Sequence, residues 1–310
     1  MSSLREKVVE EVGKVVVSRE RETELLLISL LASGHTLVEG VPGVSKTLLA
    51  KSFSECLGLG FRRVQFTPDM LPMDIVGGLV FDLKEREFEF RKGPVFTNIL
   101  LADEINRSPP KVQSALLESM QERQVTVEGH TEVLPSPHMV IATQNSVEFQ
   151  GVYPLPEAQL DRFMLRIVMG YPTVTDETAI IRRNMSGMGP EVIKKVVSPE
   201  DLDRALLDVA EVKVSDELLD YMARFAAETR ADDGLDLGAS PRAMVHLSHA
   251  SRAKAYISGR SYVIPDDIKE LALCVIPHRL GLSSRSTLLD GKLTAEEATR
   301  RIIDRVKPPR

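Results

Sequence analysis

Three sets of residues in this 310-residue chain have the types and spacing needed to bind and cleave a phosphate anhydride. The first is a loop rich in Gly and Pro, from Gly40 to Ser45, which is followed by Lys46 and Thr47. Backbone N–H groups of such a loop, together with the helix dipole, can hold a di- or triphosphate. Lys46 would contact the β- and γ-phosphates, and the Thr47 hydroxyl would bind Mg²⁺. The residues expected to hold the nucleotide are Gly40, Val41, Pro42, Gly43, Val44, Ser45, Lys46, Thr47 and Leu48.

This loop departs from the phosphate-binding pattern G-x-x-x-x-G-K-[ST] at one position. Gly40, Lys46 and Thr47 match, but Ser45 stands where the second glycine is expected. A Cβ atom costs free energy where the backbone needs an unusual φ, although a small Ser fits if the backbone is already helical. The alternative is a Gly-Pro turn that binds nothing. It is disfavoured because the loop joins a predicted strand to a predicted helix.

A pair of carboxylates forms the second set. Asp103 and Glu104 follow the apolar run from Asn98 to Ala102, which is typical of a buried parallel strand. Ligands of open α/β sheets bind at the carboxyl ends of such strands. We expect Asp103 to hold hydrated Mg²⁺ and Glu104 to polarise the water that attacks the γ-phosphate. Alone, such a pair is often only a solvated strand end, but together with Lys46 it indicates nucleotide hydrolysis.

The third set consists of Asn145 and Arg242. Asn145 follows a second predicted buried strand, where its amide can hold the attacking water or sense the γ-phosphate; alone, it would be read as a turn former. Arg242 lies in the first turn of a helix that Ser240-Pro241 can cap. From a mobile domain its guanidinium would close on the γ-phosphate and couple hydrolysis to domain motion, although such an arginine is usually just solvated.

A parallel sheet is needed to bring these residues together, and the apolar pattern predicts one. Strands are expected at 36–39, 64–66, 98–102, 138–143 and 164–169, with helices at 3–16, 22–32, 46–57 and after 108. Two β-hairpins are expected, at about 78–93 and 124–134, the first as an insertion or as part of the main sheet. From residue 173 onward the pattern is almost wholly helical. We therefore expect an α/β nucleotide-binding domain over 1–172 with two hairpin insertions and a helical domain over 173–310.

The composition is that of a soluble globular protein, with 43% hydrophobic and 27% charged residues and a net charge of −6. No apolar run approaches the roughly twenty residues of a membrane span, and no signal-peptide core is visible, so a cytoplasmic location is expected. Cys56 and Cys274 are expected to be buried thiols. Nucleic acid is not an expected partner because the chain has no clustered basic stripe.

Motifs along nearly the whole chain resemble those of a MoxR-type AAA+ ATPase, in the helix-2-insert group of AAA+ proteins. They are the phosphate-binding loop, Leu100–Arg107, Gln113–Glu118, Ala142–Asn145, Tyr153–Phe163 and Gly238–Arg242. The resemblance implies an AAA+ P-loop core and a C-terminal all-helical lid. The sequence departs from the family at Ser45, at Ser146, where Pro is usual, and at Ser18-Arg19, where Gly-Gln is usual.

The resemblance also implies roles for individual residues. Asp103-Glu104 would be the Walker B pair, Asn145 the sensor-1 residue and Arg242 the sensor-2 arginine of the lid. Arg162 would be an arginine finger, which can raise the rate about 10³- to 10⁵-fold when a neighbouring subunit supplies it. The rival fingers are Arg107 and Arg123.

The function implied by the resemblance is Mg²⁺-dependent ATP hydrolysis in a homo-oligomeric ring, expected to be a hexamer, that remodels or assembles client proteins. Partners with a von Willebrand A-type domain and a role in metal-cofactor insertion are also implied. Two alternatives stay open. A nucleic-acid motor is disfavoured by the acidic balance and the non-basic hairpin tip 128–130, and a GTPase-type switch by the lack of an Asn-Lys-x-Asp guanine reader.

Overall fold

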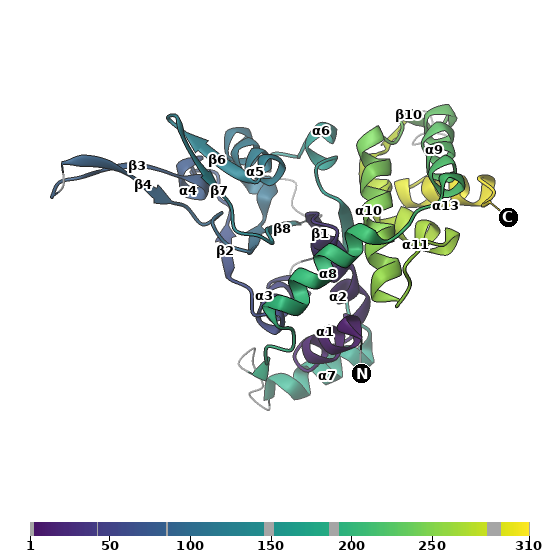
Figure 1. The fold of residues 1–310 in the computed structure, drawn as a ribbon, viewed down its shortest axis with the longest axis horizontal. Coiled ribbons are helices and arrows are strands. Elements are labelled where there is room, and N and C mark those ends of the chain that lie inside the picture. The colour runs from purple at the N-terminus through teal and green to yellow at the C-terminus, as the bar shows by residue number, and fades with distance from the viewer. Residues whose placement is uncertain are drawn as a thin grey trace.

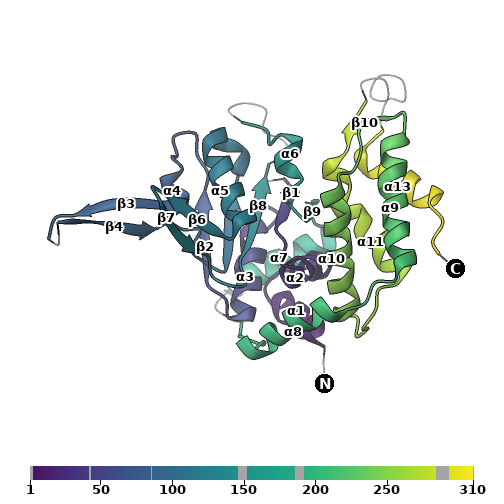
Figure 2. The same cartoon turned by 45° about the horizontal axis from the view of Figure 1, so that its top comes forward.

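A five-stranded parallel sheet forms the centre of the N-terminal part of the molecule (Figures 1 and 2). The computed structural model describes residues 3–41, 43–84, 86–145, 152–185, 192–283 and 293–309. In sheet order the strands are β2 (Phe61–Gln65), β5 (Ile99–Asp103), β8 (Met139–Gln144), β1 (Thr36–Gly40) and β9 (Leu165–Met169). The loops that follow β1, β5 and β8 therefore leave the same edge at neighbouring positions, as the sequence predicted.

Helices cover both faces of this sheet, which explains the continuous apolar run of β5. Ile99 and Leu101 belong to the core cluster that contains α1 (Leu4–Gly13), α2 (Glu20–Leu31) and α3 (Lys46–Leu57). Leu100 and Ala102 belong to the cluster on the opposite face, which contains Leu116 and Leu117 of α5 (Pro110–Glu122). Alternate residues of one strand thus point into two different apolar layers.

The two predicted hairpins are separate two-stranded sheets, so the alternative that the first belongs to the main sheet is wrong. They are β3 (Gly77–Asp82) with β4 (Glu87–Lys92), and β6 (Gln124–Val127) with β7 (His130–Val133). The β3–β4 hairpin follows the short helix α4 (Met73–Val76) and projects far from the body of the molecule (Figure 1). Its position makes it the most outlying element of the N-terminal part.

Helices dominate the chain from residue 174 onward, and those beyond residue 215 lie to the right in Figure 2. The helices are α7 (Val174–Met185), α8 (Pro199–Glu211), α9 (Asp216–Ala231), α10 (Pro241–Ile257), α11 (Pro265–Val275) and α13 (Ala295–Arg305). Serine side chains cap α8, α9 and α10 by accepting a hydrogen bond from the third backbone N–H. The elements that were not predicted include α7, which has no buried residue, and the antiparallel pair β10 (Leu235–Leu237) with β11 (Gly281–Leu282). The described helices include none with the length and apolar character of a membrane span.

Candidate functional site

The phosphate-binding loop joins β1 to α3, and its backbone has the left-handed turns that such loops require. Gly43 has φ 83° and Ser45 has φ 64° and ψ 25°, whereas Pro42 lies outside the described residues. The backbone at Ser45 is therefore left-handed, and the condition for an unstrained Ser, a backbone already in the right-handed helical region, is not met. A non-glycine residue in this conformation costs about 1–2 kcal/mol. Gly40 is needed for a different reason, because a Cβ there would lie 2.4 Å from the carbonyl oxygen of Met169.

Lys46 lies between the carboxyl ends of two strands. Its Nζ donates to the carbonyl oxygen of Gly40 at 2.8 Å and to that of Gln144 at 3.3 Å. Burial lowers the pKa of Lys46, and the carboxylates of Asp103, Glu104 and Glu39 oppose that shift. The ammonium is thus positioned by backbone carbonyls beside both carboxylates, where it can meet an anionic ligand.

The two carboxylates occupy the end of β5, and each has partners in this chain. Asp103 is buried; its Oδ1 accepts from Thr143 Oγ1 at 2.6 Å, and its Oδ2 accepts from Arg63 Nε and Nη2 at 3.0 and 2.7 Å. Glu104 Oε2 accepts from Gln65 Nε2 at 2.7 Å and from Arg107 Nη1 at 3.0 Å. Fixed carboxylates at this position suit a metal ligand and a general base.

Glu104 itself has a left-handed backbone, with φ 57° and ψ 50°. Its backbone N–H donates to Thr143 Oγ1 at 2.9 Å, and the same hydroxyl donates to Asp103. Strained φ/ψ values persist where surrounding contacts fix them, and they concentrate at functional sites. Thr143 therefore positions both carboxylates.

A cavity of about 370 Å³ collects most of the predicted site. Its lining residues are Gly43, Ser45, Lys46, Thr47, Leu48, Asp103, Glu104 and Asn145. Asn145 is buried at the end of β8, while Val41 and Val44 pack against the apolar core and offer the loop's backbone alone. The structure thus brings the loop, the Asp-Glu pair and the amide to one place, as expected from the sheet topology.

The donor set suits Mg²⁺. The Thr47 hydroxyl and the Asp103 carboxylate are hard oxygen ligands in one cavity. Within the described ranges, no three His, Cys, Asp or Glu side chains form a cluster that could hold a metal ion. Mg²⁺ is normally bound by one or two protein oxygens plus substrate phosphates and water, so an all-protein cage is not required.

Arg162 and Arg242 are not among the residues that line this cavity. Arg162 follows α6 (Glu157–Leu160) and is half-buried, and its Nε has no hydrogen-bond partner among the described residues. Burial and the neighbouring Arg242 lower the pKa of Arg162, and Glu118 opposes them. The Arg242 side chain is 43% exposed, with Nη1 3.7 Å from Asp161 Oδ2. The two arginines therefore form a cationic pair outside the cavity.

Asp161 joins this cationic pair to the lid. Its Oδ1 accepts from Ser240 Oγ, the cap of α10, at 2.8 Å and from Arg279 Nε at 2.8 Å. Arg279 belongs to the short helix η3 (Pro277–Arg279), is buried, and also donates to the carbonyl oxygens of Asp161 and Phe163. Burial lowers the pKa of Arg279 to about 10, and Asp161 opposes the shift. We call Asp161, Ser240 and Arg279 the lid joint.

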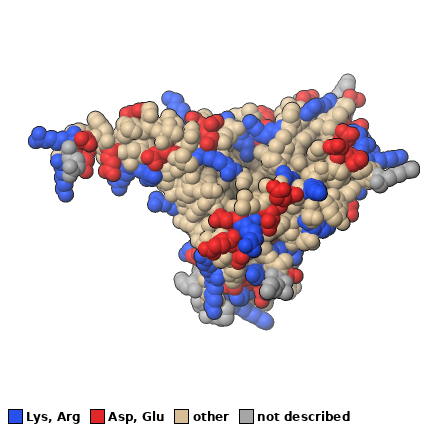
Figure 3. Space-filling model, viewed as in Figure 1, with Lys and Arg blue, Asp and Glu red and all other residues tan. Residues whose placement is uncertain are grey.

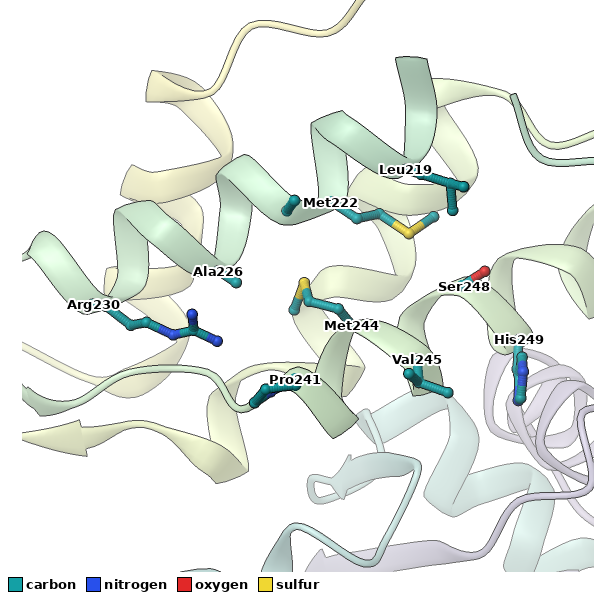
Figure 4. Close-up of a pocket in the computed structure, with 10 residues that line it drawn as sticks. Leu219, Met222, Ala226, Arg230, Pro241, Met244, Val245, Ser248 and His249 are labelled. Atoms are coloured by element: carbon teal, nitrogen blue, oxygen red, sulfur yellow. The ribbon is translucent and has the colours of Figure 1, made fainter. Parts of the chain in front are cut away.

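A larger cavity, of about 470 Å³, lies elsewhere, between α9 and α10 (Figure 4). The side chains of Met222 and Met244 lie between the two helices, and the guanidinium of Arg230 donates to the carbonyl oxygen of Ala239 at 2.9 Å. Its apolar lining offers neither a loop of backbone N–H groups nor a carboxylate. Size therefore does not identify the nucleotide site in this molecule.

Sequence reasoning missed the hydrogen bonds to the carboxylates, which come from Arg63, Gln65, Arg107 and Thr143; of these, Arg107 was considered only as a rival arginine finger. Arg63 and Gln65 are two positions apart in β2, so their side chains share a face of the strand. That spacing is visible in the sequence. The adjacency of β2 to β5 is not, because it depends on strand order.

Comparison with known proteins agrees with this geometry. The family described as "ATPase family associated with various cellular activities (AAA)" matches residues 35–165, and the AAA lid domain matches residues 227–302. Chaperone MoxR1 of Mycobacterium tuberculosis is 43% identical over 98% of this chain and 82% of its own length. YeaC of Bacillus subtilis is 43% identical over 98% of this chain and 94% of its own.

A solved structure from Cytophaga hutchinsonii, to which an ATPase activity is ascribed, has a TM-score of 0.90 and 39% identity. The match covers 99% of this chain and 96% of that one. The AAA core, the lid and these relatives together show that the chain is an ATPase that belongs to the MoxR family of AAA proteins.

Proposed function

We propose that this protein couples Mg²⁺-dependent ATP hydrolysis to chaperone-like remodelling or assembly of client proteins, including insertion of metal cofactors. One observation carries the catalytic part: Lys46, Thr47, Asp103, Glu104 and Asn145 line a single cavity. The chaperone part rests on the likeness to a protein named Chaperone MoxR1.

Each residue of the cavity has a distinct task in this proposal. Mg²⁺, held by Thr47 and Asp103 with the phosphates, would neutralise charge that develops on the transferring phosphoryl group. Lys46 would contact the β- and γ-phosphates. Glu104 would accept a proton from the attacking water, and Asn145 would orient that water or report the γ-phosphate. Arg242 would close on the γ-phosphate when the lid moves.

We further propose that the protein works as a ring, specifically a hexamer, in which Arg162 completes a neighbour's site. Both rival fingers are already engaged in this chain: Arg107 Nη1 lies 3.0 Å from Glu104, and Arg123 Nη2 donates to the carbonyl oxygen of Ser33 at 2.7 Å. The Nε of Arg162 has no partner within the described ranges. A guanidinium near a subunit surface and outside its own cavity suits action in trans.

Exposed apolar side chains support a protein client. On the β3–β4 hairpin, Phe81, Leu83 and Phe88 are exposed, and Leu83 reaches 84% exposure. Such residues on an outlying element favour contact with another protein. We also propose a partner with a von Willebrand A-type domain and a cytoplasmic location. A Glu104→Gln variant with ATP bound is the form with which to capture a client protein or that partner.

A nucleic-acid motor is the second candidate, and the charge pattern opposes it. On the face shown in Figure 3, basic and acidic side chains are interspersed. The tip of the second hairpin carries Glu128 beside Gly129 and His130. DNA-stimulated hydrolysis would favour the motor, and equal turnover of GTP and ATP would favour a nucleotide switch.

The test of the catalytic proposal is a pair of variants. Glu104→Gln should bind ATP but hydrolyse it about 10²- to 10⁴-fold more slowly, because an amide cannot accept the proton. Lys46→Ala should instead lose nucleotide binding. Turnover by Glu104→Gln at the parental rate would show that Glu104 is not the base.

A further inference from the structure

Arg63 of β2 reaches across to the carboxylate that is expected to bind the metal. Its Nε and Nη2 both donate to Asp103 Oδ2, at 3.0 and 2.7 Å. The Arg63 side chain is 47% exposed, whereas that of Asp103 is 12% exposed. Asp103 is therefore held inside the site, whereas Arg63 contacts it from the solvent side and can leave.

This contact uses the oxygen that a metal ion would need. Asp103 Oδ1 already accepts from the Thr143 hydroxyl at 2.6 Å and Oδ2 accepts both hydrogen bonds from Arg63, so three of the roughly four acceptor positions of the carboxylate are used within this chain. A guanidinium carries the charge that a cation would otherwise supply to the carboxylate. Arg63 and a divalent cation thus compete for the same negative group.

The contact extends to the general base. Arg63 Nη2 also donates to Gln65 Oε1 at 2.7 Å, and Gln65 Nε2 donates to Glu104 Oε2 at 2.7 Å. Arg63 and Gln65 share one face of β2, whose residue 65 lies opposite Asp103 in the sheet. A change at Asp103 that displaces Arg63 would therefore also free the residue that holds Glu104.

We propose that Arg63 is an internal cation that Mg²⁺ must displace from Asp103, so that it sets the metal concentration at which the nucleotide site fills. The proposal rests on the proposed Mg²⁺·ATP site. Arg63 is a positioning residue here: it compensates Asp103 before the metal arrives, and it does not touch the substrate.

The test measures binding rather than turnover. A fluorescent, non-hydrolysable ATP analogue is held at fixed concentration while Mg²⁺ is titrated, with wild type, Arg63→Gln and Arg62→Gln compared. Arg62 is the matched control because it is an exposed arginine on the opposite face of the same strand. Arg63→Gln should lower the half-saturating Mg²⁺ concentration about three- to tenfold, since a charged hydrogen bond to Asp103 no longer competes. Arg62→Gln should not shift it.

A second variant separates charge from shape. Arg63→Lys keeps the competing charge, so its Mg²⁺ midpoint should stay within about twofold of the wild type. The same midpoint for Arg63→Gln and Arg62→Gln, or a higher one for Arg63→Gln, would overturn the proposal while leaving the nucleotide site intact. A wild type that binds no analogue at any Mg²⁺ concentration would instead refute the proposed function, and this inference with it.

Discussion

The carboxylate site and the arginine pair differ in how far one chain satisfies its own charges. Asp103 accepts three hydrogen bonds and Glu104 two from side chains of this subunit, and Thr143 contacts both the Asp103 carboxylate and the Glu104 backbone N–H. Arg162 lies beside Arg242, and the buried Nε of Arg162 has no hydrogen-bond partner in the part of the chain that the structure describes. A buried donor without a partner costs roughly 1–3 kcal/mol. Within one chain the carboxylates are therefore better satisfied than the guanidinium of Arg162, which is why we propose that a second subunit meets Arg162.

The largest expected effect comes from the arginine side of this comparison. Arg162→Ala should bind ATP but lose about 10³- to 10⁵-fold in turnover, because the charge on the transferring phosphoryl group loses its guanidinium. Arg123→Ala is the control, since Arg123 is committed to Ser33. ATP turnover and nucleotide binding are measured for both variants. Arg162→Ala turnover within about tenfold of wild type would remove Arg162 from the mechanism.

Sequence reasoning predicted the carboxylate side better than the arginine side for a physical reason. The apolar run from Asn98 to Ala102 predicts a strand buried on both faces, and Asp103 must then lie at the carboxyl end of that strand. The partners Arg63 and Thr143 depend on strand order, which short-range pattern does not encode. The lid joint depends on Arg279 meeting Asp161 across 118 positions of sequence.

Two details of local structure were hidden for other reasons. The sequence left the backbone at Ser45 open, because the phosphate-loop pattern has glycine at this position whereas Ser is not a residue type that signals a positive φ. Helix α7 was missed although Val174, Ile181 and Met185 recur at helical spacing, and in the structure this apolar stripe is exposed instead of packing on a core.

A second prediction concerns how the stability of the lid joint depends on pH. His246 Nδ1 lies 2.7 Å from Arg279 Nη2, so the neutral ring accepts that hydrogen bond. Burial, followed by Arg279, lowers the pKa of His246 to about 3, against an ordinary value of 6.5. The unfolded chain therefore binds the proton more readily. The stability from His246 is complete above about pH 6.5 and is lost as the pH falls toward 3.

Thermal unfolding at pH 7.5 and 5.5 measures this effect. His246 should contribute about 1.4 kcal/mol of the loss between these values, or about 3–5 °C of the fall in Tm. His246→Asn should reduce the fall by that amount, whereas His130→Asn, on the exposed β6–β7 hairpin, should not. If the Tm of His246→Asn falls as much as that of the wild type between these pH values, the acid sensitivity does not come from the lid joint.

The smallest expected effect is on the carboxylate side, at Ser45. Glycine adopts a φ of 64° without the penalty that Ser carries, so Ser45→Gly should stabilise the protein by about 0.5–1 kcal/mol after the entropy of the unfolded chain is counted. A preformed loop should also bind nucleotide about two- to fivefold more tightly. Ser33, with φ 57°, is the matched control: Ser33→Gly should raise Tm but leave nucleotide affinity unchanged. Equal affinity in both variants would mean that Ser45 does not limit binding.

In the proposed ring, the carboxylate site of one subunit works with Arg162 of the next. Mixing Arg162→Ala chains with Glu104→Gln chains tests it most directly, because each variant alone lacks one part of every site. Some mixed interfaces join an intact Glu104 to an intact Arg162, so the mixture should recover part of the wild-type ATP turnover. A mixture that stays inactive, although mixed rings form and the wild type is active, would show that Arg162 does not complete a neighbour's site.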